Sequence, residues 1–145
     1  MTFSIITACF NASSTIADTL NSIANQSYQK IEHIIIDGAS VDDTLKIVQQ
    51  FPHVSICISE KDGGIYDAMN KGIELCTGDI IGILNADDVY ANQDVISKVA
   101  EFFKDESVDA VYGDLVFVDQ QQTNIIRRKW VAGTYHYKQF YNGWM

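Results

Sequence analysis

Short apolar runs alternate with amphipathic stretches along most of the chain. The run at residues 3–8 is typical of a strand buried on both faces of a sheet. We expect strands at residues 3–8, 31–36, 54–58 and 80–84, separated by helices whose apolar stripes start at Ile16, Leu45, Ile65 and Val95. Strands that alternate with helices are joined by crossover connections, so the pattern predicts an α/β fold with a mainly parallel sheet flanked by helices.

Polar residues mark where these elements should begin and end. The expected caps are Asn11, Ser13 and Ser14 for the first helix, Ser40 for the second and Gly78 at the end of the third. Asp42 and Asp43 would then lie in the first turn of the second helix, where the helix dipole favours carboxylates. Further strands are expected at 108–118 and 125–130, joined by a turn over 120–124.

Composition and charge narrow the class of protein. The chain has 145 residues, 47% of them hydrophobic, which favours one folded domain over residues 1–145 and excludes disorder. Ten Lys and Arg against 19 Asp and Glu give a net charge of −9, which argues against binding nucleic acid or an anionic membrane through bulk charge. A small anionic ligand remains compatible with this charge if local donors or a metal ion hold it.

Cysteine and histidine give no sign of a metal cluster or a disulfide framework. The residues concerned are Cys9, Cys57, Cys76, His33, His53 and His136. The cysteines are odd in number and widely spaced, so we expect three buried thiols in a reducing compartment. The histidines lack ligand spacing and are expected to be structural or exposed. The N-terminus lacks the basic start of a signal peptide, and no apolar run is long enough to span a membrane.

Carboxylates collect just after the predicted strands, which is the main functional signal. In parallel sheets, ligands bind beyond the carboxyl ends of the strands. Asp87 and Asp88 would be tolerated there if a divalent cation lay between them and a ligand, although a solvated turn explains the same pair. Asp37 could accept a hydrogen bond from a nucleobase, although a strand-to-helix turn with Gly38 at positive φ fits as well.

A glycine pair precedes the third predicted helix. Residues 61–72 lack the P-loop pattern, but free N–H groups after Gly63 and Gly64 could face a phosphate. The alternative is a flexible loop capped by Asp62. Gly72, inside the helix, predicts close packing against the sheet or a ligand. The basic residues 127–129 are more typical of a solvated strand than of a phosphate clamp.

Four segments together resemble the family 2 glycosyltransferases, which have the Rossmann-like GT-A fold. They are residues 4–11 (SIITACFN), 34–44 (IIIDGASVDDT), 63–72 (GGIYDAMNKG) and 78–88 (GDIIGILNADD). The resemblance covers about residues 3–120. The residues of its motifs are similar to those of the branch that builds bacterial surface polysaccharides of the colanic acid type. It implies a nucleotide-sugar-binding donor domain over 1–145.

The resemblance also implies roles for individual residues. The implied nucleotide-binding residues are Thr7, Asn11, Asp37, Asn70, Asn85 and Ala86, and the implied ligands of Mn²⁺ or Mg²⁺ are Asp87 and Asp88. Among them, Asp37 matches the carboxylate that contacts the base, usually uracil. Asn85 departs from the first Asp of the DxD motif and would contact ribose or a metal-bound water. Gly38 replaces the second acidic residue of the commoner Asp-Asp-Gly-Ser form.

The implied reaction is inverting transfer of a sugar, most often from a UDP-sugar, to a saccharide or lipid-linked acceptor. The metal neutralises charge on the leaving diphosphate, and a carboxylate base deprotonates the acceptor. No residue here is a convincing base, so we expect it beyond Met145. Asp114 and Asp119 are expected to be structural or donor-side. A cytoplasmic location, with peripheral association at the inner face of the membrane, is compatible with such acceptors.

Two alternatives stay open at this point. The chain could be a non-catalytic nucleotide-sugar-binding fragment of the same fold, because an acceptor half is missing and aromatic residues crowd positions 135–144. It could also be a nucleotidyltransferase or a receiver-like phosphoryl-transfer domain. Those classes predict a Gly-rich, Arg-containing loop after the first strand, or a lone Asp with a distal Lys, whereas residues 11–14 read Asn-Ala-Ser-Ser.

Overall fold

A computed structural model describes residues 1–119, 122 and 125–135, which form two compact units, residues 1–104 and 105–145. The first unit contains β1 (Phe3–Cys9), α1 (Ile16–Ala24), β2 (Ile31–Asp37), α2 (Thr44–Val48), β3 (Val54–Ser59), α3 (Ile65–Leu75), β4 (Ile80–Ile83) and α4 (Val95–Phe102). The second contains β5 (Leu115–Val118) and β6 (Ile126–Trp130). Each unit is described separately below.

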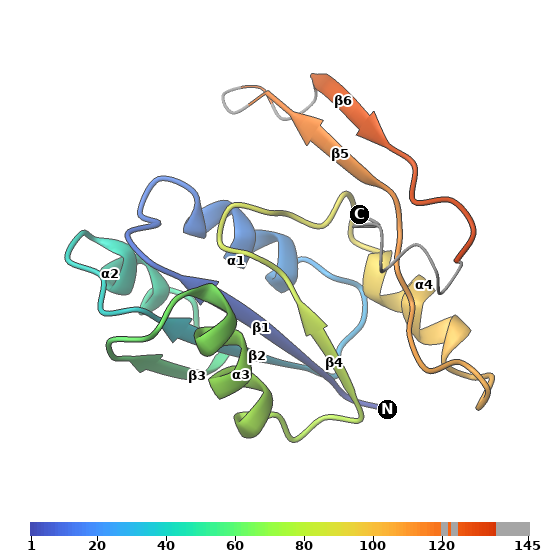
Figure 1. Ribbon diagram of the computed structural model, residues 1–145, viewed down its shortest axis with the longest axis horizontal. Coiled ribbons are helices and arrows are strands. Elements are labelled where there is room, and N and C mark those ends of the chain that lie inside the picture. Colours follow the sequence, from blue (N-terminus) through green and yellow to red (C-terminus); the bar gives the residue numbers. More distant parts are fainter. Residues whose placement is uncertain (120–121, 123–124, 136–145) are drawn as a thin grey trace. The chain divides into compact units, whose positions relative to one another are not determined.

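The first unit is built on a parallel sheet with the strand order β3-β2-β1-β4 (Figure 1). β1 is central, with Phe3 opposite Ile31 on one side and Ile80 on the other. All seven residues of β1 are buried, as its mostly apolar sequence predicts. The predicted α/β class and mainly parallel sheet are confirmed. The register brings the carboxyl ends of β1 and β2 together, with Cys9 opposite Asp37.

Side chains alternate between the two faces of the sheet because the strand period is two. On one face, residues such as Ile6 and Ile34 pack with Ala68 of α3. On the opposite face, Ile35 packs with residues of α1 and α2, and Ile5 packs with residues of α1 and α4. Figure 1 shows α3 lying over the sheet apart from the other helices. The sheet is therefore the middle of three layers.

Gly72 allows α3 to approach the sheet closely. A Cβ built on Gly72 would lie 2.5 Å from Cγ2 of Ile6, a fully buried residue of the central strand. Such a contact forces a shift in a close-packed interior. The close packing expected from the sequence is therefore confirmed, and the partner is the sheet.

Several local expectations were wrong. Ser40 does not cap α2, because its N–H and hydroxyl both donate to Asp37, and α2 begins only at Thr44. α1 has Thr15 at its N-cap, without a side-chain cap hydrogen bond. α3 ends with Cys76 at its C-cap, two residues before the expected Gly78. None of the expected cap residues therefore lies at a cap position of its helix.

The cysteines and histidines differ in part from expectation. All three cysteines are free, but only Cys9 is buried; Cys57 is exposed and Cys76 is half-buried. Cys57 lies on an edge strand whose burial alternates, so one face of β3 is open. His33 and His53 stack with their ring centroids 5.3 Å apart, which fits a structural role. His136 lies outside the described residues.

The buried His33 predicts a loss of stability in mild acid. Its Nε2 lies 3.1 Å from Thr7 Oγ1 and its Nδ1 lies 3.2 Å from His53 Nε2. Burial, and secondly the nearby His53, lowers the pKa of His33 from 6.5 to about 3. Below pH 6.5 the unfolded chain therefore binds a proton that the folded chain refuses, so stability is complete above pH 6.5 and falls toward pH 3.

We expect the free energy of unfolding to drop by about 2 kcal/mol between pH 7 and pH 5 through this residue. Guanidinium unfolding at the two pH values measures the drop. The variant His33→Gln keeps a hydrogen-bonding side chain but does not titrate, so its stability should change less over the same interval. An equal drop in both proteins would show that His33 is not responsible.

The second unit contains an antiparallel hairpin of β5 and β6. Its exposed basic residues pair locally: Arg127 with Asp119 at 2.7 Å and Lys129 with Asp114 at 3.7 Å. Arg128 lies over the Phe117 and Trp130 rings. The basic patch is thus a solvated strand, as expected, and both acidic residues have structural partners.

The strand expected at 108–118 begins only at Leu115. The turn expected at 120–124 is described only at residue 122, and Tyr135 is the one described member of the aromatic group near the end of the sequence. Tyr137, Phe140, Tyr141 and Trp144 lie outside the described residues.

Within the described ranges, no helix is both long and apolar enough to cross a bilayer.

Candidate functional site

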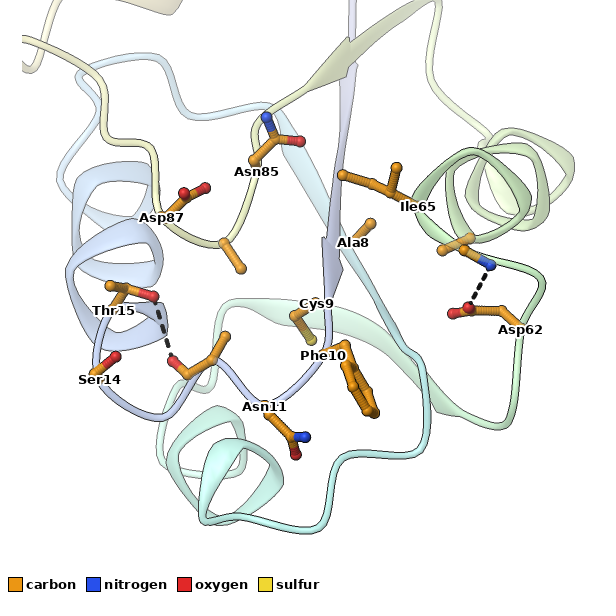
Figure 2. A pocket seen from close by; sticks show the side chains of 14 residues that line it. Ala8, Cys9, Phe10, Asn11, Ser14, Thr15, Asp62, Ile65, Asn85 and Asp87 are labelled. Atoms are coloured by element: carbon orange, nitrogen blue, oxygen red, sulfur yellow. Dashed lines mark hydrogen bonds between the residues drawn. The ribbon is translucent and has the colours of Figure 1, made fainter. Parts of the chain in front are cut away.

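A pocket of about 610 Å³ lies at the carboxyl ends of β1 and β4 (Figure 2). Four segments contribute to it: the end of β1, the β1–α1 loop, the start of α3 with the preceding loop, and the loop after β4. Its lining consists of Ala8, Cys9, Phe10, Asn11, Ala12, Ser14, Thr15, Asp62, Gly64, Ile65, Ala68, Asn85, Ala86 and Asp87. This is the edge at which parallel sheets bind ligands.

The β1–α1 loop is fixed by the loop that follows β2. Asn11 has a positive φ of 49°, and its N–H donates to Ser40 Oγ at 2.7 Å. Its side-chain Oδ1 accepts from the N–H of Val41 at 2.9 Å. Asp42 accepts from the N–H of Ser13 at 3.0 Å, and hydrogen bonds, first of all from Thr44, hold the pKa of this carboxyl well below its usual range. The floor of the pocket is therefore pre-organised by two loops bonded to each other.

The β4 loop presents an amide and a carboxylate to the pocket. Asn85 Nδ2 donates to Asp88 Oδ2 at 3.1 Å, which leaves Asn85 Oδ1 buried without a hydrogen-bond partner. Asp87 is exposed and lines the pocket. Burial, with a smaller contribution from Asp87, raises the pKa of Asp88 despite the opposing bond from Asn85. A buried polar atom without a partner is uncommon in native proteins, so Asn85 Oδ1 points to an unmet ligand.

The donor set fits a hard divalent cation. Asp87 and Asn85 supply oxygen atoms, which Mg²⁺ and Mn²⁺ prefer. Among the described residues, no group of three or more His, Cys, Asp or Glu could hold a metal by itself. An ion at this position would therefore take most of its ligands from water and from a bound diphosphate, as Mg²⁺ commonly does.

The opposite side of the pocket is formed at the start of α3. Gly64 has a φ of 114°, which glycine adopts readily, and its N–H donates to Asp62 Oδ1 at 2.9 Å. Lys71 ties the same loop to α3 through Glu60 Oε1 at 2.7 Å and the Lys61 carbonyl at 3.3 Å. Asp62 thus caps the loop as expected, whereas α3 itself has Gly64 at its N-cap and no side-chain cap hydrogen bond. In Figure 2 the Asp62 and Asp87 carboxylates lie on opposite sides of the pocket.

The structure brings four of the eight predicted site residues to this pocket: Asn11, Asn85, Ala86 and Asp87. The other four lie outside its lining. Thr7 is fully buried against His33. Asp37 is also fully buried and accepts hydrogen bonds from Ser40 and Ser59. Asn70 is exposed on α3, and Asp88 holds the Asn85 amide.

Ten of the fourteen lining residues were not predicted as site residues, among them Phe10 and Asp62. Phe10 is 64% exposed at the end of β1, and Asp62 ends the loop after β3. Phe10 could have been found, because a large apolar side chain directly after a buried strand has no core to enter. Asp62 gave a weaker signal, because a loop capping residue and a ligand-binding carboxylate have the same sequence pattern.

The layered fold places an acidic, oxygen-rich pocket at the carboxyl edge of the sheet, which is where α/β domains of this class bind ligands. The model of the family described as Glycosyl transferase family 2 matches residues 4–144. The chain therefore belongs to this family, and its fold is the GT-A fold of glycosyltransferases.

Relatives and solved structures agree with this assignment. Over 119 residues, the chain is 39% identical to a PGL/p-HBAD biosynthesis glycosyltransferase of Mycobacterium bovis, covering 79% of this chain and 46% of that protein. It is 38% identical over 113 residues to the chondroitin synthase of Escherichia coli, covering 75% and 16% respectively. The chain thus spans less than half the length of these relatives.

Two solved structures share the fold at 25% sequence identity. One is a mannosyltransferase from Pyrobaculum calidifontis in complex with GDP-Man and Mn²⁺, with a TM-score of 0.68 over 80% of this chain and 35% of that one. The other is S. aureus TarS 1-349 in complex with UDP-GlcNAc, with a TM-score of 0.67 over 72% of this chain and 31% of that one. Both bind a nucleotide-sugar.

Proposed function

We propose that the pocket is the donor site of a glycosyltransferase that transfers a sugar from a nucleotide-sugar, most often a UDP-sugar, to an acceptor hydroxyl. The observation that carries the proposal is the pairing, in one pocket, of a metal-compatible end at Asn85 and Asp87 with an exposed aromatic face at Phe10. A diphosphate suits the first end, and a nucleobase can stack on the second. Residues 1–145 are then a single donor-binding domain.

Asp87 and Asn85 would hold Mn²⁺ or Mg²⁺, and Asp88 orients the Asn85 amide through its hydrogen bond. The ion, when bound, supplies positive charge that stabilises the leaving diphosphate. Asn11 and Ala86 line the pocket between these ends and would contact the nucleotide. The chain's own task is to hold the donor in one orientation, because transfer depends on the position of the reacting carbon relative to the acceptor.

The acceptor belongs to the same proposal. We assign it to a growing surface polysaccharide or a lipid-linked saccharide, as in the colanic acid type of pathway, with inversion at the transferred sugar. The mycobacterial relative is named a biosynthesis glycosyltransferase, and the Escherichia coli relative is named a chondroitin synthase. A lipid-linked acceptor would place the enzyme at the inner face of the membrane by peripheral association. No residue of this chain is assigned as the catalytic base.

Isothermal titration calorimetry with UDP tests the donor site. We expect saturable UDP binding in Mn²⁺ or Mg²⁺ that weakens at least about tenfold after chelation, because the ion supplies most of the attraction for the diphosphate in this acidic chain. GDP and dTDP, titrated in parallel, compare the nucleotides. If none of the three nucleotides binds with either metal, the proposed function is wrong. Turnover with a lipid-linked or oligosaccharide acceptor then separates an enzyme from a binding fragment.

A further inference from the structure

The carboxylate of Asp62 occupies the space that a side chain at position 38 would fill. A Cβ built on Gly38 would lie 2.8 Å from Asp62 Oδ2 and 3.5 Å from Phe10 Cδ2. The first distance is too short for a real contact, so a side chain at residue 38 would require the Asp62 carboxylate to move from its place. Asp62 reaches this place from the loop after β3, across the end of β2.

The two oxygens of Asp62 have different surroundings. Oδ1 accepts the N–H of Gly64 at 2.9 Å, which fixes the orientation of the carboxylate. In the part of the chain that the structure describes, no donor reaches Oδ2. Both Asp62 and the 64% exposed ring of Phe10 line the pocket (Figure 2). The pocket therefore has one free anionic acceptor beside an aromatic surface.

Asp37 is the carboxylate that the family resemblance implies for contact with the nucleobase, but it is enclosed by the protein. It is fully buried, and its oxygens accept from the N–H of Ser40 at 2.9 Å and the hydroxyl of Ser59 at 2.6 Å. Cys9 Sγ, 3.6 Å away, donates to the same carboxylate. A ligand in the pocket would have to displace these donors to reach it.

We infer that Asp62 is the residue that selects the nucleobase of the donor, accepting one N–H through Oδ2 from a base stacked on Phe10. The inference rests on the proposed function and deepens it. A single acceptor matches the N3–H of uracil. Cytosine has a lone pair at the same ring position and would face the carboxylate with two acceptors opposed. The site therefore favours uridine over cytidine nucleotides.

The ratio of UDP to CDP affinity, measured in Mn²⁺, tests this assignment. The unaltered chain should prefer UDP by about 100-fold, because a mismatched polar group in a formed site is strongly rejected. In Asp62→Asn the amide oxygen keeps the Gly64 N–H, and the NH₂ group takes the place of Oδ2. This group opposes the N3–H of uracil and can donate to N3 of cytosine, so the preference for UDP should be lost or reversed. The ratio is insensitive to the lost charge, which affects both diphosphates equally.

Asp67→Asn is the matched control. Asp67 also accepts a loop N–H, that of Gly63 at 2.9 Å, and it lies in the first turn of α3, but it does not line the pocket. This variant should keep the 100-fold preference. A second test exchanges the two positions: Gly38→Asp combined with Asp62→Ala places a carboxylate in the same space from the other strand end. This double variant should recover uridine preference relative to Asp62→Ala alone.

The outcomes separate the inference from the proposed function. If the unaltered chain binds UDP but does not prefer it to CDP, or if Asp62→Asn keeps the full preference, Asp62 does not select the base, while the donor site stands. If the unaltered chain binds no nucleotide in either Mn²⁺ or Mg²⁺, the proposed function fails and the inference fails with it. Circular dichroism of each variant confirms that a change in ratio comes from a folded protein.

Discussion

Replacing Asp87 by alanine should weaken Mn²⁺-dependent UDP binding by about 100-fold, since loss of even an indirect metal partner costs 10- to 100-fold. Asp87 is the exposed carboxylate of the β4 loop, and its neighbour in the pocket, Asn85, offers only a neutral oxygen. Without Asp87 the pocket has no charged ligand at this end. Calorimetry in Mn²⁺ and in chelator measures the effect, and the two conditions should become nearly equal.

Two comparison variants make this result specific. Asp43→Asn removes a surface carboxylate that pairs with Lys46 and should leave UDP affinity unchanged. Asp88→Asn keeps an oxygen acceptor for the Asn85 amide and should weaken binding less than tenfold if Asp88 only positions that amide. A larger loss in Asp88→Asn than in Asp87→Ala would make Asp88 the principal ligand instead.

The sheet was predictable because the sequences of its inner strands are mostly apolar. These strands are β1 and β2, and in the structure most residues of both strands are buried between helices. Helix boundaries were less predictable. The expected role of Ser40 as a helix cap failed because a buried carboxylate at Asp37 competes for its hydroxyl and N–H. Asp37 lies only three residues before Ser40, but its burial depends on the packing of the sheet and not on the local sequence pattern.

The site was predictable where it follows the strand ends directly. Asn11, Asn85 and Asp87 come immediately after β1 and β4, and all three line the pocket. The two implied residues that lie within strands, Thr7 and Asp37, do not line the pocket. Thr7 and Asp37 fall at odd positions, the same parity as Ile5 and Ile35, so their side chains face the core under α1 and α2. Strand parity, read from the sequence, could have identified this orientation.

The contribution of Asp62 could not be predicted because it depends on distance in space alone. Position 62 and position 38 are far apart in the sequence, and the loop that carries Asp62 is fixed by Lys71 and Gly64 rather than by a regular element. Gly38 could be noticed as a departure from the commoner acidic form, but the sequence does not say what fills the space.

Replacing Asp37 by asparagine should lower the free energy of unfolding by about 3 kcal/mol, because hydrogen bonds to a charged group contribute about 1.5–3 kcal/mol each and a mispaired buried donor adds a cost. Asp37 is fully buried among donors from Ser40, Ser59 and Cys9. Asparagine would direct an N–H₂ group at one pair of these donors in either orientation. Equilibrium unfolding in guanidinium measures the change, and thermal unfolding gives an independent check.

Asp62→Asn is the natural comparison, because it removes a carboxylate from a partly exposed loop and should change stability by less than about 0.5 kcal/mol. The two variants then differ in opposite ways: Asp37→Asn is destabilised but, where folded, keeps its preference for UDP over CDP, whereas Asp62→Asn is stable and loses it. A stable Asp37→Asn protein that no longer prefers UDP would reverse both assignments. Asp37 would then contact the nucleobase directly. The hydrogen bonds that Ser40, Ser59 and Cys9 donate to it would have to break when the nucleotide-sugar binds.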